Sequence, residues 1–261
     1  MSWFNIWRGW VKLEISKLMA YRFNFVLKSI AMLIFGIGGP LIAMIIYNIS
    51  SGIPGWTFEE FLLINGIFIF IAGLNHLLFE SMTWRIIHKV RDGSFDVRLV
   101  KPISALIYAT ITGVELEGLS RTFLGGIIIV YSLVKMGWAF SLINLVSFIF
   151  LIFLAMIFMY SIDVITTALS FLVVKSYALM DIFREFTHVG RYPITIYGTT
   201  GMMAFTFLFP VGLAAFYPAS AILGKIPTIT IFYLAAVAFA FFGFSILLWK
   251  LAIRKYSSAG G

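Results

Sequence analysis

Six long apolar runs account for most of the chain, and short polar segments separate them. The runs are continuously apolar and do not alternate with polar residues, which favours membrane-spanning helices over strands. About 20 such residues are enough for a helix to cross a bilayer. We therefore predict an all-α integral membrane protein with a six-helix transmembrane domain over residues 27–250. The predicted spans cover about residues 27–48, 58–82, 104–134, 140–174, 197–216 and 229–250.

The pattern before the first run is different. Over residues 1–26, apolar residues such as Trp7, Trp10 and Leu13 recur at helical spacing, and Arg8 and Lys12 fall on the opposite side. Tryptophan at headgroup depth with basic residues toward anionic lipid is typical of an interfacial helix. We expect an N-terminal interfacial amphipathic helix here. The alternative is a flank of the first span that is periodic by chance.

The basic residues predict the orientation of the spans. With the N-terminus in the cytoplasm, 16 of the 19 Lys and Arg residues fall on the inner side, because only Lys135, Lys225 and Arg121 fall elsewhere. This asymmetry follows the positive-inside rule and predicts that both termini are cytoplasmic. Residues 251–261 then form a cytoplasmic tail. Splitting the long fourth run would place the later loops on the wrong side, so we expect one tilted or bent helix there.

Composition narrows the possible functions. The chain has 261 residues, of which 61% are hydrophobic and 11% are charged, against about 25% charged in a soluble domain. A soluble enzyme is excluded, and no segment is long and polar enough to form a catalytic domain. The net charge of +8 reflects topology and lipid contact, so it gives no reason to expect nucleic acid as a partner.

The most polar segment is the predicted cytoplasmic loop over residues 84–102. Ile86, Ile87 and Val90 recur at helical spacing, and Gly93 then interrupts the pattern. Short amphipathic segments of this kind suit docking to a soluble partner, with apolar side chains in a groove and charges at the rim. The alternative is a basic loop that only sets topology.

This loop resembles the pattern R-x-G-x-(F/L)-D-x-x-L-x-(R/K)-P of the membrane subunits of type-two ABC exporters. The matching residues are Arg91, Gly93, Phe95, Asp96, Leu99, Lys101 and Pro102. Residues 190–198, residues 209–224 and the ending from Arg254 also resemble one branch of these proteins, the ABC-2 family transporter proteins, in the same order. Lys101 departs from the commoner Arg, which matters little for a charge in a loop.

The resemblance implies a non-catalytic permease subunit in the plasma membrane of a prokaryote. Two such subunits, identical or homologous, would pair among membrane lipids, and a coupling helix within residues 84–102 would receive a separate ABC ATPase subunit. ATP and Mg²⁺ would bind to that partner. The sequence itself agrees, because it contains no G-x-x-x-x-G-K-[ST] motif to hold a triphosphate. We expect no cofactor, metal or catalytic residue in this chain.

Charged residues within the predicted spans are further candidates. Glu115, Glu117 and Arg121 lie in the third run, and intramembrane charges are costly enough to suggest function. Glu117 and Arg121 are four residues apart, so they can pair on one helix face. The residues either gate or line a pathway or form a structural ion pair at its inner mouth. Asp163 in the fourth run, and Asn65, Asn75 and His76 in the second, are weaker candidates, because a polar group in a helix bundle more often hydrogen-bonds to a neighbouring helix.

The segment over residues 217–228, before the last run, holds Pro218, Gly224 and Pro227 among small apolar residues. Non-helical backbone at membrane depth requires shielding by protein or a cavity. We therefore expect a short broken or re-entrant helix that caps the outer end of the pathway. An exposed loop is the alternative.

Two other classes of function are compatible with the sequence. A secondary transporter or channel could use Glu115, Glu117 and Arg121 for ion coupling, although the two halves of the chain show no convincing internal repeat. A membrane-embedded enzyme acting on lipid is disfavoured, because no nucleophile–base pair or metal-ligand constellation is evident.

Overall fold

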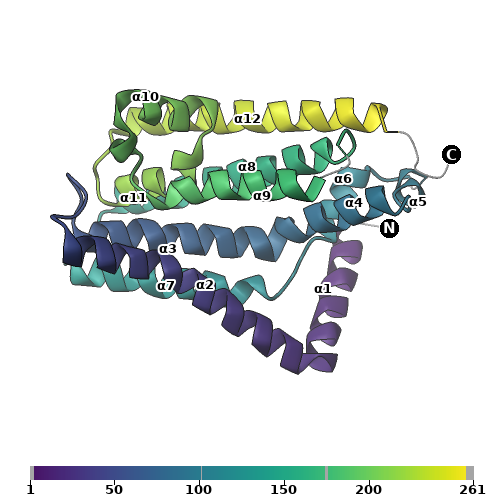
Figure 1. The fold of residues 1–261 in the computed structure, drawn as a ribbon, viewed down its shortest axis with the longest axis horizontal. Coiled ribbons are helices and arrows are strands. Elements are labelled where there is room, and N and C mark those ends of the chain that lie inside the picture. The colour runs from purple at the N-terminus through teal and green to yellow at the C-terminus, as the bar shows by residue number, and fades with distance from the viewer. Residues whose placement is uncertain (1–2, 101, 174–175, 257–261) are drawn as a thin grey trace.

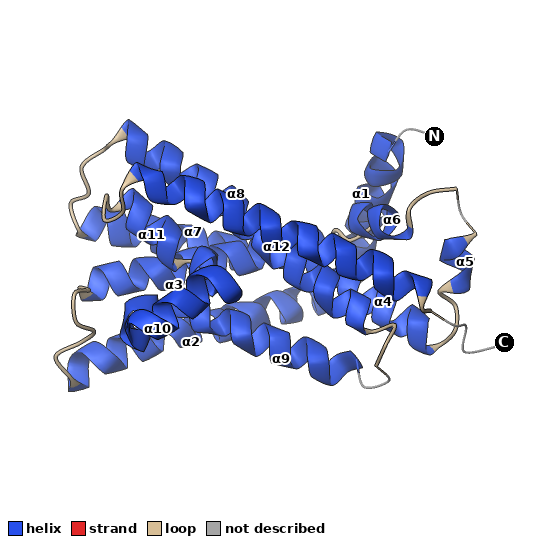
Figure 2. Cartoon of the chain, turned by 90° about the horizontal axis from the view of Figure 1, so that it is seen from above, coloured by secondary structure: helices blue, strands red, loops and turns tan. Residues whose placement is uncertain are grey.

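The computed structural model describes residues 3–100, 102–173 and 176–256, so Lys101 of the predicted coupling segment lies outside the described residues. All regular structure in this part of the chain is helical (Figures 1 and 2). Five helices are long and apolar enough to cross a membrane. They cover Arg22–Ile49, Phe58–Arg91, Gly118–Lys135, Leu142–Leu169 and Thr228–Arg254.

The first two helices form an angle at the edge of the bundle. Helix α1 covers Trp3–Ala20 and lies across the direction of the long helices, whereas α2 covers Arg22–Ile49 and runs obliquely to them, diverging toward its junction with α1 (Figure 1). Helix α2 therefore begins before the predicted boundary at residue 27. Trp10 faces the rest of the protein, because its Nε1 donates to the carbonyl oxygen of Val114 at 3.4 Å. In contrast, Trp7 and Leu13 on α1 are exposed.

The second span is longer than predicted. Helix α3 covers Phe58–Asn75 and begins with a capping box between Thr57 and Glu60, which satisfies the first free N–H groups of the helix. It continues through a π-helical turn, η1 (His76–Glu80), into α4 (Ser81–Arg91). A π-helical turn inside a long helix often marks a functional site.

The third predicted span is broken. Helix α6 covers Ala105–Ile111 and α7 covers Gly118–Lys135, so the expectation of one helix over residues 104–134 is wrong. The backbone between them bonds to the second span instead, since Glu115 N donates to Leu77 O at 2.9 Å and Ser81 Oγ donates to Gly113 O at 2.6 Å. Glu115 and Glu117 consequently lie in this break and not within a membrane-spanning helix.

Helices α3 and α7 pack against each other through glycine residues. A methyl group placed on Gly125 of α7 would overlap the backbone nitrogen of Phe70, and one placed on Gly73 of α3 would overlap the backbone nitrogen of Thr122. Small residues at such positions let two helix backbones approach closely, which is a common basis of helix association in membranes.

The last part of the chain packs around α8 (Leu142–Leu169), a single helix as predicted for the fourth run. Helix α12 (Thr228–Arg254) lies along α8, and the short buried helix α11 (Phe216–Ile222) packs beside it (Figures 1 and 2). Helix α9 (Ser176–His188) follows α8 and leads into the short turn η2 (Val189–Arg191).

The fifth predicted span, over residues 197–216, consists of short pieces. These are η3 (Ile194–Tyr197), α10 (Gly198–Met203), η4 (Ala204–Leu208) and η5 (Val211–Ala214). The continuous apolar part, Ile194–Leu208, is shorter than the other spans. The count of six crossings therefore stays a prediction.

Several shorter helices lie at the two ends of the bundle. Helices α4, α5 (Asp96–Leu99) and α6 lie at the same end as α1 and the end of α12, whereas α10 and α11 lie at the opposite end (Figure 1). This arrangement places the two described ends of the chain and the 84–102 loop at one end of the bundle. That this end is cytoplasmic stays a prediction.

Candidate functional site

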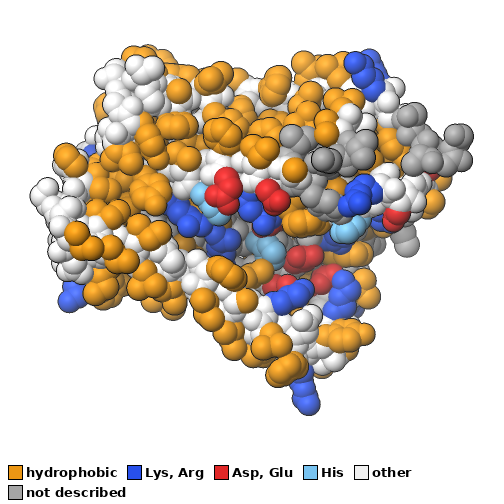
Figure 3. Space-filling view, viewed as in Figure 1, with side chains coloured by type: hydrophobic (Ala, Val, Ile, Leu, Met, Phe, Trp, Pro, Cys, Tyr) orange, Lys and Arg blue, Asp and Glu red, His pale blue; other side chains and the backbone are white. Residues whose placement is uncertain are grey.

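A polar cavity of about 480 Å³ opens between α2, α3, α8 and α9. Figure 3 shows basic, acidic and histidine side chains gathered in a hollow on an otherwise largely hydrophobic face. His76 and His188 belong to its lining. Its charged residues are Glu80, Arg121, Asp163, Arg184 and Arg191. Charges placed among membrane-spanning helices are functional candidates by default.

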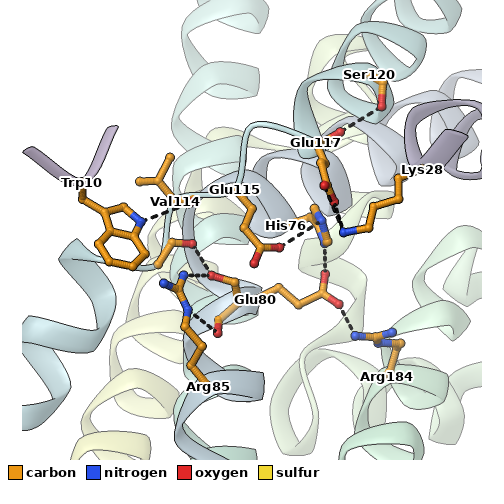
Figure 4. A network of polar contacts seen from close by, with 12 residues as sticks. Trp10, Lys28, His76, Glu80, Arg85, Val114, Glu115, Glu117, Ser120 and Arg184 are labelled. Carbon is orange, nitrogen blue, oxygen red and sulfur yellow. Dashed lines mark hydrogen bonds and ion pairs between the residues drawn. The ribbon is translucent and has the colours of Figure 1, made fainter. Parts of the chain in front are cut away.

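Glu80 connects the second span to α9. Its carboxylate binds the guanidinium group of Arg184 through one oxygen and lies 2.9 Å from His76 Nδ1 through the other (Figure 4). Glu80 and His76 are four residues apart and both belong to the π-helical turn. The turn therefore presents an acid and an imidazole on one side, toward a cation supplied by α9.

Asp163 is placed between α8 and the second span. Its Oδ2 accepts a hydrogen bond of 3.0 Å from Asn75 Nδ2, and its backbone oxygen accepts bonds from Thr83 at 3.4 Å and Thr167 at 2.6 Å. Both Asp163 and Asn75 are buried. The structure thus gives Asp163 an interhelical hydrogen bond and also a place in the lining of the cavity.

Arg121 does not have the partner that its spacing suggests. Glu117 instead accepts hydrogen bonds from Lys28 Nζ at 3.1 and 3.2 Å, so the expected Glu117–Arg121 pair is wrong. The reason is that Glu117 precedes α7, where the side chain turns toward α2, whereas Arg121 lies one turn inside the helix and lines the cavity. The Nε atoms of Arg121 and Arg191 are buried without a hydrogen-bond partner among the described residues.

Glu115 lies beside this network. Its Oε2 is 3.6 Å from His76 Nε2, and burial raises the pKa of the Glu115 carboxyl group. His76, Glu115 and Glu117 offer donor atoms within 4.8 Å of one another, a grouping that could hold a metal ion. However, the ammonium group of Lys28 already binds the Glu117 carboxylate (Figure 4). We therefore describe the group as an ion-pair network in which Lys28 is the cation.

The 84–102 loop has a defined conformation up to Val100. Helix α4 ends at the exposed Arg91, and Gly93 follows with a φ of 73°, a left-handed conformation that favours glycine. Across Gly93, the hydroxyl and backbone N–H of Ser94 donate to Asp92 Oδ1 at 2.6 and 2.9 Å, which lowers the pKa of Asp92. The chain turns here and begins α5 at Asp96.

The apolar residues of this loop fall into two groups. Phe95 is fully buried, with its ring 5.0 Å from Phe171 and 5.5 Å from Tyr256 between ring centroids. In contrast, Val97 and Val100 are 63% and 82% exposed. Leu99 and Pro102 are also exposed. Phe95 therefore anchors the loop, and the exposed group forms a short apolar surface around α5.

The predicted outer segment is a buried short helix followed by a turn. Pro218 is buried within α11, Gly224 adopts a φ of 68° after that helix, and Pro227 precedes α12. Lys225 in the turn binds Glu60 Oε2 at 2.7 Å and lies 4.3 Å from the centre of the Trp56 ring. These contacts join the turn to the beginning of α3.

Sequence reasoning missed part of the cavity. Glu80 lies four residues after His76 in the second run, and this spacing was a usable signal. Arg184 and Arg191 were interpreted only as cytoplasmic charges, and nothing in their sequence spacing connects them to Arg121. Their juxtaposition depends on the way α9 folds back along α8.

Several long apolar helices, packed through glycines and enclosing a charged cavity, define a multi-pass α-helical membrane protein. A family model described as ABC-2 family transporter protein matches residues 32–260. The chain belongs to this family of membrane components of ABC transporters. Comparisons with curated proteins and with solved structures give no match.

Proposed function

We propose that the chain is the permease subunit of an ATP-driven exporter. It would form the translocation path as a dimer with an identical or homologous permease and would couple to separate ATPase subunits through residues 84–102. ATP and Mg²⁺ would bind to those ATPase subunits, and this chain would supply no catalytic residue or cofactor site. Membership of the ABC-2 family supports the permease role.

The observation that carries the coupling proposal is the position of Phe95. Its ring packs against Phe171, just after α8, and against Tyr256, just after α12. Force applied to the exposed residues of α5 would therefore reach the ends of two long helices through packed aromatic rings. Rigid-body movement of packed helices is a common form of conformational switching, and it would alternate access to a path between the subunits.

The docking test uses co-expression with an ABC ATPase encoded nearby. Replacing Val97 and Val100 with Asp should abolish both the co-purification of the ATPase and the stimulation of its activity, because apolar contacts at an interface core do not tolerate buried charge. Charge reversal at Arg91 and Asp96 should weaken the complex as well. Lys135→Glu, at the far end of α7, is the control. Unchanged ATPase docking in all loop variants would overturn the coupling proposal.

The proposed topology has six crossings and two cytoplasmic termini in a prokaryotic plasma membrane. Residues 194–216 would together form the fifth crossing, and the short helix and turn over residues 217–228 would cap the outer end of the path. Because the chain contains no cysteine, single cysteines can be introduced without background labelling. An impermeant thiol reagent should label Lys135→Cys and Lys225→Cys in intact cells. Arg91→Cys should react only after lysis, and the opposite pattern would invert the topology.

A secondary transporter or channel is the second candidate function. The partly buried Glu80 and His76 and the buried Asp163 in one cavity favour it, because titratable groups among membrane helices often carry ions or protons. Substrate movement that requires a proton gradient and proceeds without nucleotide would support this function and exclude the ATP-driven one.

A further inference from the structure

We propose that the cavity between α2, α3, α8 and α9 binds the anionic group of an amphipathic ligand, a phosphate or carboxylate, through Arg121 and Arg191. As an account of the transported substrate this inference rests on the proposed permease function. As a statement about binding it can be tested on the purified chain alone.

Arg121 and Arg191 are the basic side chains of the cavity lining that lack a carboxylate partner among the described residues. No acidic group among the described residues lies within 4.0 Å of either guanidinium group, and the Nε atom of each is buried without a partner. Burying a charged donor without an acceptor is costly in free energy. An anion between these groups would supply the missing acceptors, and the planar guanidinium group matches phosphate and carboxylate oxygens well.

The other charges of the cavity are already engaged. Arg184 is bound to Glu80, and Asp163 accepts a hydrogen bond from Asn75. At the rim, His188 Nδ1 lies 3.5 Å from Glu185. Three guanidinium groups and two carboxyl groups, those of Glu80 and Asp163, line the cavity. Basic groups therefore outnumber acidic groups in the lining, which favours an anionic ligand.

Phe68 positions one of the two arginines. The guanidinium carbon of Arg191 lies 5.0 Å from the centre of the Phe68 ring, and the same ring makes an edge contact of 5.7 Å with His188. Arg191 is thus supported on an aromatic face, a contact that leaves the planar fork of the guanidinium group able to bind an anion.

The apolar lining indicates that the ligand has a hydrophobic part. Met32, Met159, Met180 and Phe183 line the cavity beside the charged groups. Methionine side chains adapt to irregular apolar ligands, and a volume of about 480 Å³ is within the range of small-molecule sites. A headgroup held by the two arginines with an apolar chain along these residues accounts for both kinds of lining.

The test measures retention of anionic lipid by the purified chain in nanodiscs. The discs contain phosphatidylcholine with a minor fraction of phosphatidylglycerol, and native mass spectrometry counts the lipid that stays bound. Arg121→Gln and Arg191→Gln should each lower phosphatidylglycerol retention about tenfold or more, because a charge-assisted contact is lost. The matched control Lys135→Gln removes an exposed basic residue away from the cavity and should retain lipid like the parent chain. Thermal unfolding of each variant verifies folding.

Competition with inorganic phosphate identifies the source of the anion. Displacement of the lipid by millimolar phosphate, with direct binding of phosphate, would indicate a site for a free anion. Retention that phosphate does not displace would indicate an amphipathic ligand. Equal phosphatidylglycerol retention in the parent chain and the Arg121→Gln/Arg191→Gln double variant would overturn the proposal. Failure of ATPase docking with intact lipid binding would instead overturn the permease function and leave this site in place.

Discussion

The ring of Phe95 packs 5.5 Å from the ring of Tyr256, so the polar loop after the second span is joined to the end of the last helix. These residues are far apart in the sequence, and each follows a different long helix. Phe171, which follows α8, completes the cluster with a distance of 5.4 Å to Tyr256. A single aromatic side chain therefore connects the loop to two helix ends.

Replacing Phe95 with Ala should lower the free energy of unfolding by about 3–5 kcal/mol, because a fully buried ring is removed and a cavity is left. The same change should leave ATPase docking in place and impair transport. The loop would still present α5 to the ATPase but would no longer be packed against Phe171 and Tyr256. The measurement is thermal unfolding in detergent. Val97→Ala, at an exposed position of the same loop, should change stability by less than about 0.5 kcal/mol. Equal effects of the two substitutions would contradict the anchoring role.

Two adjacent glycines of α7 provide a matched pair for testing helix packing. Gly125→Ala should destabilise the protein by about 1–3 kcal/mol, because its methyl group would overlap the backbone of Phe70. Gly126→Ala should be neutral or stabilising by up to about 1 kcal/mol, since its nearest neighbour would be 4.0 Å away and alanine is the better helix former. Thermal unfolding of both variants tests this contrast. A harmless Gly125→Ala would show that α3 and α7 are farther apart than described.

Glu80 and Arg184 should show strong energetic coupling. Glu80→Gln alone should cost about 1–3 kcal/mol, because it leaves the Arg184 guanidinium group without its carboxylate at a partly buried position. The Glu80→Gln/Arg184→Gln double variant should lose less stability than the sum of the two single variants. A double-mutant cycle measures this difference. Simple additivity would show that α9 is not held to the second span by this pair.

The partner of Glu117 can be decided by exchanging charges. Lys28→Glu and Glu117→Lys should each destabilise by no more than about 1 kcal/mol, because the Lys28 side chain is 52% exposed and solvent screens the pair. The exchanged double variant should recover most of this loss. A parallel cycle with Arg121→Gln should show weaker coupling to Glu117. Stronger coupling to Arg121 would restore the pairing inferred from sequence spacing.

The helical class and the long spans could be predicted because hydropathy depends on local sequence. The break before α7 could not, since Gly113 and Glu115 bond to Ser81 and Leu77 of another helix. Spacing along one helix likewise suggested Arg121 as the partner of Glu117, and the actual partner, Lys28, comes from α2. Local patterns identify which charges are unusual, whereas their partners are determined by tertiary packing.

The candidate sites also differ in how far a local sequence pattern could identify them. The 84–102 loop could be found because its polarity and its residue pattern are contiguous in the sequence. The cavity could be found only in part, because Arg121, Arg184 and Arg191 come from separate segments. Sequence also gave no reason to separate Phe95 from Val97, although one is buried and the other exposed.

The hydrogen bond between Asn75 and Asp163 has a consequence for how the helices are aligned. Two apolar helices in a bilayer can pack in many rotations about their axes, because lipid tails are apolar neighbours as well and favour none of these rotations. A buried amide and carboxyl group bond only in one orientation. Asn75, Asp163 and the nearby Thr83 and Thr167 therefore set the rotation of α8 against the second span. In this mostly hydrophobic chain, a few polar atoms specify which of many equally apolar helix packings is the native one.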